Sequence, residues 1–236
     1  MTHGIDTKNL FPSHVAFIMD GNRRWAKKKN LPIIDGHKKG AEIIKKIVRK
    51  SIKLNIKYLT FYGFSNENWN RSKNEVVQLQ SLLKLYLDSE TDSFMKNQIN
   101  FSFIGDIGKF DFLIREKLYS LQKATSSFKN LFFTLALGYG SRGEILGSIN
   151  KILKKKQIKT DITEKDISDN LMTSHLPEPD FVIRTSGEKR LSNFLLWQIA
   201  YSELYFTKTQ WPDFNLTRYM IALKNFINRK RRYGGD

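Results

Sequence analysis

The segment from His14 to Gly40 holds the residues best suited to chemistry. An apolar run, Val15–Met19, ends on the carboxylate of Asp20. Five residues that could surround an anion follow directly: Gly21, Asn22, Arg23, Arg24 and Trp25. A carboxylate at a strand end, followed by donors at a helix start, suits a metal-bound phosphate ester. Each residue alone also fits an ordinary strand–turn–helix, but together they are poor packing material. The segment therefore predicts a phosphate site.

Three further polar segments follow apolar runs, and they could lie beside the first. They are Ser65–Arg71, Gly138–Arg142 and Arg184–Asn193. In a parallel sheet the carboxyl ends of the strands meet at one edge, so loops that follow them converge there. Arginine, which recurs in these segments, makes bidentate contacts with phosphate. The sequence thus predicts a site for one diphosphate, or for two.

The elements that would position these loops alternate along the chain. Strand-like runs are Val15–Met19, Tyr58–Tyr62, Ile99–Ile104, Leu131–Leu137, Phe181–Ile183 and Leu204–Phe206. Helical spacing of apolar residues marks Ala41–Leu54, Val76–Met95, Asp111–Ala124, Gly143–Lys155 and Leu216–Ile227. This alternation predicts an α/β fold with a mostly parallel six-stranded sheet covered by helices. We expect one domain over residues 1–236, with a flexible start at 1–12 and a basic tail at 229–236.

Composition narrows the class of protein. The chain has 236 residues and a net charge of +17, from 40 basic and 23 acidic residues. Such an excess attracts polyanions: nucleic acid, acidic membrane surfaces or phosphorylated substrates. Without cysteine there is no disulfide and no thiolate zinc site. No apolar run approaches the roughly 18 residues of a membrane span, and no signal-peptide region is evident. We therefore expect a cytoplasmic protein.

Two other functions deserve comparison. Gly138–Gly143 matches the dinucleotide-binding pattern G-x-G-x-x-G, but that pattern needs an acidic residue about 20 positions on, where this chain is lysine-rich. Net charge and the run Arg229–Arg232 would suit a nucleic-acid-binding protein. Against it, the other arginines cluster beside carboxylates, which repel a phosphate backbone unless a metal intervenes. The four histidines have no close metal spacing, and His14 fits a strand entry better than a metal ligand.

Three segments together resemble one family, the cis-prenyltransferases, and specifically the bacterial undecaprenyl diphosphate synthases. They are His14–Gly40, the run GFSNENWNRSKNEV, and PEPDFVIRTSGEKRLSNFLLWQIAYSELYFT. The resemblance implies an enzyme that condenses isopentenyl diphosphate onto an allylic diphosphate, usually farnesyl diphosphate, with Mg²⁺. It also implies a homodimer, a C55-type product for cell-wall glycan carriers, and transient membrane contact at the inner face. Nucleic acid would then be no partner.

The resemblance also implies roles for single residues. Asp20 would hold Mg²⁺ at the allylic diphosphate, and Glu203 would be a second magnesium-linked carboxylate. The allylic site would further include Gly21, Asn22, Arg23, Arg24, Trp25 and His37. A second motif matches at Ser65, Asn66, Glu67, Trp69 and Arg71. Within it Asn68 is the usual proton acceptor, although a neutral amide is a weak base and orients a substrate more readily. Isopentenyl diphosphate would be clamped by Arg184, Arg190, Leu191 and Ser192.

Several details follow from the same resemblance. The product chain would need an apolar tunnel, for which Val76–Met95 and Leu131–Leu137 are candidates, although both also suit plain core packing. The tail residues Arg231–Gly235 would reach the partner subunit's active site. Ile33 stands where family members commonly carry arginine, so one phosphate contact is absent or replaced by a lysine such as Lys29. A non-catalytic subunit is disfavoured because Asp20, Asn68, Arg184, Arg190 and Glu203 are all present.

Overall fold

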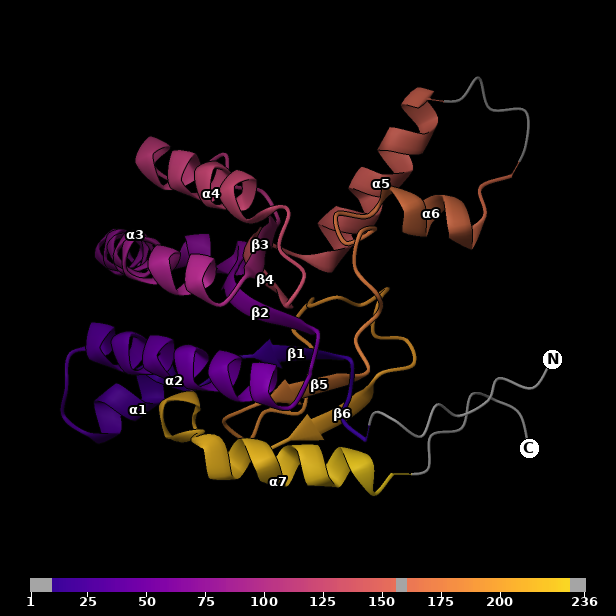
Figure 1. Cartoon of the computed structure of the whole chain (residues 1–236). Helices are drawn as coiled ribbons and strands as arrows, with labels where there is room; N and C mark the ends of the chain where they lie inside the picture. Colours follow the sequence, from indigo (N-terminus) through magenta and orange to yellow (C-terminus); the bar gives the residue numbers. More distant parts are fainter. Residues whose placement is uncertain (1–9, 156–160, 230–236) are drawn as a thin grey trace.

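A six-stranded parallel sheet forms the centre of the computed structural model, which describes residues 10–155 and 161–229 (Figure 1). The strand order is β3-β4-β2-β1-β5-β6, and each neighbouring pair is parallel. The strands are β1 His14–Ile18, β2 Tyr58–Ser65, β3 Ile99–Ile104, β4 Leu131–Tyr139, β5 Phe181–Arg184 and β6 Glu203–Phe206. Strand β1 is buried throughout because helices and loops cover both faces of a parallel sheet. The predicted fold class is confirmed.

One face of the sheet packs against four helices. They are α2 Ile33–Lys53, α3 Lys73–Lys96, α4 Phe112–Thr125 and α7 Leu216–Ile227. The interface is aromatic: Phe17 and Phe61 stack with ring centroids 4.8 Å apart, and Tyr219 of α7 packs beside Phe17. These residues belong to the larger of two apolar clusters, which joins the strands to all four helices. This cluster supplies most of the hydrophobic stabilisation of the fold.

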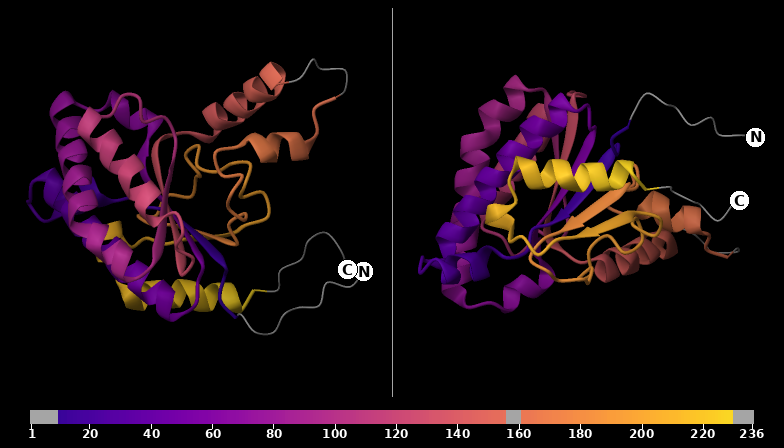
Figure 2. Two further views of the ribbon diagram at one scale, coloured as in Figure 1. Left: turned by 45° about the horizontal axis from the view of Figure 1, so that its top comes forward. Right: turned by 90° about the horizontal axis from the view of Figure 1, so that it is seen from below.

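The opposite face is covered mainly by an irregular segment. Small and medium side chains there, including Ala16, Ala136 and Val182, pack against Phe194 and Leu195. On this side of the sheet lie α5 Ser141–Lys155 and α6 Glu164–Asn170, which pack against each other (Figure 2). The far end of α5 leans away from the body of the protein (Figure 1). Short strand side chains let the irregular segment approach the sheet closely.

The helix after the first loop is longer than its apolar spacing predicts. It begins at Ile33 instead of Ala41, and it therefore includes Gly36 and Gly40. Both glycines face the turn before it, where α1 Asn22–Lys28 starts. A Cβ on Gly36 would come 2.2 Å from the carbonyl oxygen of Asn22, and one on Gly40 would come 2.6 Å from Asn22 Oδ1. Close approach of the two helices thus requires glycine, despite its low helix propensity.

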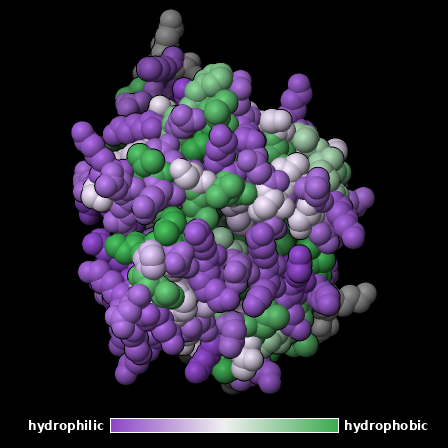
Figure 3. All heavy atoms as spheres, turned by 90° about the vertical axis from the view of Figure 1, so that its left-hand side faces the viewer, coloured by the Kyte–Doolittle hydropathy of each residue, from purple (hydrophilic) through white to green (hydrophobic). Residues whose placement is uncertain are grey.

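The remaining elements are two short 3₁₀ helices, η1 Asn66–Asn70 and η2 Trp211–Asp213. The outer side of the helix layer, which includes α1 to α4, is mostly hydrophilic with separate hydrophobic clusters (Figure 3). Within residues 10–155 and 161–229, none of the helices combines the length and apolarity needed to cross a bilayer. The expected flexibility of residues 1–12 and the basic tail at 229–236 concern segments that lie almost wholly outside the described residues.

Candidate functional site

Asp20 lies just beyond the carboxyl end of β1, where ion pairs fix its carboxylate and hydrogen bonds fix its backbone. Its carboxylate pairs with Arg24 at 3.1 Å and with Arg184 at 3.0 Å. Its backbone carbonyl accepts the hydroxyl of Thr185 at 2.6 Å and the N–H of Trp211 at 3.0 Å. The carboxylate keeps 27% of its exposure, whereas the Arg184 side chain keeps 4%. Asp20 is therefore a fixed, accessible carboxylate flanked by two guanidinium groups.

Glu188 joins two arginines that the sequence assigned to different diphosphates. It accepts a hydrogen bond from Arg24 Nη1 at 2.8 Å and another from Arg190. Both hydrogen bonds lower the pKa of the Glu188 carboxyl group, and the bond from Arg24 contributes most. The same two guanidinium groups could bind a phosphate, so the Glu188 carboxylate takes the place that a phosphate ligand would take between them.

Arg184 links Asp20 to the loop that follows β5. Its Nη1 atom lies 2.7 Å from Ser192 Oγ and also donates to the backbone carbonyl of Arg190. The pairing of Ile18 with Arg184 in neighbouring strands sets this position, because both strands end at the same edge. The three residues predicted to clamp isopentenyl diphosphate with polar groups are thus brought together.

The loop after β2 is a compact 3₁₀ turn. Asn68 Oδ1 accepts the backbone N–H of Ser65 at 3.0 Å, which together with the reciprocal Ser65 contact forms a capping box. The Asn68 carbonyl oxygen is therefore already engaged with the backbone. Trp69 does not line the site: its ring packs against Phe64 and Phe110, with centroids 4.7 Å and 4.9 Å apart. This tryptophan stabilises the loop from below.

These segments enclose a polar pocket at the carboxyl ends of β1, β2 and β5. Its lining is Ile18, Met19, Asp20, Tyr62, Ser65, Glu67, Asn68, Arg71, Arg184, Arg190, Ser192 and Asn193. Most of the predicted side chains from the second motif and the clamp are present. Tyr62 and Asn193 were missed by sequence reasoning. Asn193 directly follows a predicted ligand, so its position was the one available signal.

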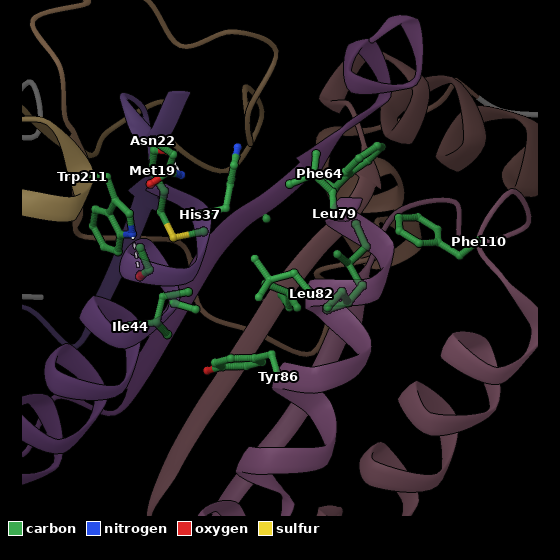
Figure 4. A pocket seen from close by; sticks show the side chains of 16 residues that line it. Met19, Asn22, His37, Ile44, Phe64, Leu79, Leu82, Tyr86, Phe110 and Trp211 are labelled. Carbon is green, nitrogen blue, oxygen red and sulfur yellow. Dashed lines mark hydrogen bonds between the residues drawn. The ribbon is translucent and has the colours of Figure 1, made fainter. Parts of the chain in front are cut away.

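A second pocket, open to solvent, is shown in Figure 4. Met19 lines both this pocket and the polar one. The walls of the second pocket are mainly apolar side chains of α2, α3 and β4, with Leu79, Leu82 and Tyr86 from α3. The candidate tunnel walls at Val76–Met95 and Leu131–Leu137 thus face a real cavity as well as the core.

Two polar atoms in that pocket are buried without a protein partner. They are Asn22 Oδ1 and His37 Nε2. Burial, with a further contribution from the nearby Arg71 cation, lowers the pKa of His37 to about 4. The imidazole is therefore neutral near pH 7, and its Nε2 atom can form one hydrogen bond with a ligand. Both residues lie beside Met19, which precedes Asp20.

Other predicted residues serve the surroundings of the site. Gly21 adopts a φ of 110°, which favours glycine. Arg23 pairs with Glu75 at 3.5 Å and is half exposed, and Trp25 donates its indole N–H to Asp213 at 2.8 Å. Leu191 packs against the second apolar cluster. Asn66 belongs to the η1 turn, and Ile33, at the start of α2, lines neither pocket.

Glu203 does not join Asp20 within one subunit. It is the first residue of β6 and pairs in register with Phe181, so it lies at the amino end of the strands. Asp20 lies beyond their carboxyl end. The Glu203 carboxylate is bound by Arg229 at 2.5 Å. A single metal shared by these two carboxylates of one chain is therefore ruled out by the geometry. The predicted role of Arg231–Gly235 falls on residues outside the described part.

Comparisons with known proteins agree with this site. The family described as "Putative undecaprenyl diphosphate synthase" matches residues 18–234. An isoprenyl transferase of Aquifex pyrophilus is 47% identical over 94% of this chain and 96% of its own. A ditrans,polycis-undecaprenyl-diphosphate synthase specific for (2E,6E)-farnesyl diphosphate, from Photorhabdus laumondii, is 44% identical over 99% of this chain and 93% of its own.

Solved structures show the same fold. Lavandulyl diphosphate synthase of Lavandula x intermedia, crystallised with dimethylallyl diphosphate, superposes with a TM-score of 0.92 at 35% identity and covers 96% of this chain and 99% of its own. A probable undecaprenyl diphosphate synthase of Campylobacter jejuni gives a TM-score of 0.80 at 32% identity, covering 95% of this chain and 99% of its own.

Proposed function

Because this chain belongs to the undecaprenyl diphosphate synthase family of prenyltransferases, we propose that it adds isopentenyl diphosphate units to farnesyl diphosphate and makes a long polyprenyl diphosphate such as undecaprenyl diphosphate. One observation carries this proposal. A polar pocket with Asp20 between two arginines lies beside an apolar pocket lined by α2, α3 and β4, and Met19 lines both. A substrate with a diphosphate head and an isoprenoid tail matches the two pockets together.

The allylic diphosphate belongs beside Asp20. Its C1–O bond must break, and negative charge develops on the departing diphosphate. Arg24, with backbone and amide donors at the start of α1, would stabilise that charge from fixed positions, as preorganised donors do in other enzymes. Asn22 and His37 line the apolar pocket, where Asn22 Oδ1 and His37 Nε2 would orient the substrate.

Isopentenyl diphosphate belongs on the other side of Arg184. Arg190 and Ser192 would hold its diphosphate, and its C4 would bond to the allylic C1 while a proton leaves C2. We assign Asn68 to orienting this substrate. Its carbonyl oxygen already accepts the N–H of Ser65, and a neutral amide is a poor general base.

The side chains of the site suit an Mg²⁺ ion that binds together with the substrate diphosphate. Within the described residues, no group of three or more His, Asp or Glu side chains could enclose a metal. Mg²⁺ commonly binds one or two carboxylates together with substrate phosphates, and Asp20 supplies one accessible carboxylate. When bound there, the ion would neutralise charge on the leaving diphosphate. Glu203 remains a candidate ligand only for a different ion or subunit arrangement.

We further propose a homodimer and a peripheral contact with the membrane. Exposed Leu146 and Leu153 on α5 offer an apolar surface that a second copy would cover. The net charge of +17 favours approach to an anionic lipid surface, where a long polyprenyl product has to go.

The direct test is incubation of the purified chain with farnesyl and isopentenyl diphosphates and Mg²⁺, followed by chromatography of the products. We expect repeated addition and a long-chain product. A single condensation product would limit the proposal to short chains, whereas no consumption of isopentenyl diphosphate would overturn it. Sedimentation of the same sample, with Leu146→Asp as a variant, tests the dimer.

A further inference from the structure

Asn193, which follows the proposed ligand Ser192, contacts two other segments of the site. Its Oδ1 atom accepts the backbone N–H of Arg142 at 2.9 Å. Its backbone carbonyl accepts the N–H of Ser141 at 2.8 Å. Its Nδ2 atom lies 3.5 Å from Oε1 of Glu67. One residue therefore connects the clamp after β5 to the start of α5 and to the turn after β2.

The contacts with α5 replace the usual cap of that helix. The first N–H groups of a helix lack acceptors within it and usually bond to a polar side chain just before it. Here that position is Gly140, and Asn193 supplies the acceptors from 51 positions beyond Arg142. Glycine is required for this, because a Cβ on Gly140 would come 2.6 Å from Asn193 Nδ2. The glycine-rich segment after β4 thus makes room for an amide.

The backbone around Asn193 is strained. Ser192, Asn193 and Leu195 have φ angles of 49°, 61° and 47°, a region that non-glycine residues seldom adopt. Such conformations persist only where surrounding contacts hold them. The strained segment places Ser192 Oγ 2.7 Å from Arg184 Nη1. The bonds of Asn193 to α5, together with the bond from Leu196 N–H to Ser141 Oγ, hold this conformation against α5.

From these contacts we infer that Asn193 is a positioning residue for the isopentenyl diphosphate clamp, an inference that rests on the proposed function. It holds Ser192 and Arg184 in place, and an amide is required because the side chain accepts from α5 and donates to Glu67. A carboxylate could replace only the first of these contacts. It would also set two negative groups side by side at the edge of an anion site.

The test compares Asn193→Asp, Gly140→Ala and Gly143→Ala in the full chain, by steady-state kinetics with both substrates. Loss of one hydrogen bond with a charge mismatch predicts a KM for isopentenyl diphosphate raised about ten-fold in Asn193→Asp. The KM for farnesyl diphosphate should stay near wild type. Gly140→Ala should reproduce this split by displacing the amide. Gly143→Ala is the matched control, because a Cβ there meets nothing within 4 Å.

A rescue separates positioning from general damage. In the double variant Asn193→Asp with Glu67→Gln, the amide of residue 67 can donate to the carboxylate of residue 193, so the hydrogen bond returns with its direction reversed. The KM of the double variant for isopentenyl diphosphate should therefore be well below that of Asn193→Asp and close to that of Glu67→Gln alone. Wild-type KM in Asn193→Asp, equal rises for both substrates with a lower melting temperature, or no recovery in the double variant would each overturn the inference. Failure of the proposed function shows separately, as wild-type chain that consumes neither substrate.

Discussion

The Arg184 guanidinium and the Asp20 carboxylate meet at 3.0 Å, although the two residues are 164 positions apart. The parallel pairing of β1 with β5 brings their strand ends together. Arg184 also contacts Ser192, so this ion pair connects the two proposed diphosphate positions. A change of charge at one diphosphate position during the reaction therefore alters the electrostatic potential at the other.

Replacement of Asp20 by alanine should lower kcat by a factor of about 10²–10³, since a preorganised charge-stabilising group contributes roughly 3–4 kcal/mol to such reactions. The melting temperature should fall as well, because the buried Arg184 cation loses its counter-charge, so kcat is compared at a temperature where the variant is folded. Glu42→Ala is the control, as that exposed carboxylate pairs with Lys39 at the surface. Near-normal kcat in Asp20→Ala at saturating Mg²⁺ would exclude Asp20 from the reaction.

Glu188→Gln should strengthen the binding of inorganic pyrophosphate. The carboxylate competes for Arg24 and Arg190, and an exposed pair of this kind is weak, so a gain of up to about five-fold is expected. Isothermal titration at low salt measures the constant, and the gain should shrink as salt is added. Glu164→Gln, on exposed α6, serves as control. Weaker binding would show that Glu188 orders the arginines instead of competing for them.

Leu82→Trp should shorten the product. Leu82 points into the apolar pocket in Figure 4, and an indole there removes space for the growing chain while the diphosphate positions stay intact. Leu85→Trp is the matched control, because Leu85 is on the same helix but 62% exposed. Chromatography of the products decides the matter: the same chain length from both variants would mean that the chain grows elsewhere.

Acid should destabilise the fold through His14. The imidazole is buried between the carbonyl of Pro177 at 2.7 Å and the hydroxyl of Thr60 at 2.8 Å. Burial lowers its pKa from 6.5 to about 4. The unfolded chain therefore binds the proton more readily, and stability present above pH 6.5 is lost as pH falls toward 4.

For His14 alone this linkage predicts a loss of about 2 kcal/mol between pH 7 and pH 5. Urea unfolding at both pH values measures it, and His14→Gln should reduce the pH dependence by that amount even though the variant is less stable overall. An unchanged pH dependence in the variant would mean that the pKa of His14 is not depressed in the folded protein.

Much of the fold was predictable because its patterns are local. The helix at Leu216–Ile227 has the predicted bounds, since its apolar residues repeat on one face and its cap Asn215 precedes them. The Asp20 loop was predictable for a similar reason: its residue types are unsuited to packing. The longer start of α2 was not, because glycine has low helix propensity and the close approach of Gly36 and Gly40 to Asn22 depends on the fold.

The parts of the site that were missed depend on contacts across the fold. Asn193 looks like any loop residue until α5 lies against it. Glu203 directly precedes the predicted strand Leu204–Phe206, whereas Asp20 follows the run Val15–Met19, so a parallel sheet already separates the two carboxylates; their common metal role rested on the resemblance alone. Trp69 stands among polar neighbours, yet its ring packs beneath the loop. Local pattern identifies residue types, whereas strand register decides which of them meet.

Asn193 caps α5 from a distant part of the same chain, and this has a consequence for synthesis of the protein on the ribosome. The ribosome releases β1 to β4 and α5 before it releases β5 and Asn193, so the early part of the chain holds Asp20 without Arg184 and α5 without its acceptors. A domain generally folds as a unit, and here β5, Asn193 and Trp211, which all belong to the site, emerge late. We therefore expect nascent or prematurely terminated chains to be catalytically silent, so that only a fully translated polypeptide draws on the cell's supply of isoprenoid precursors.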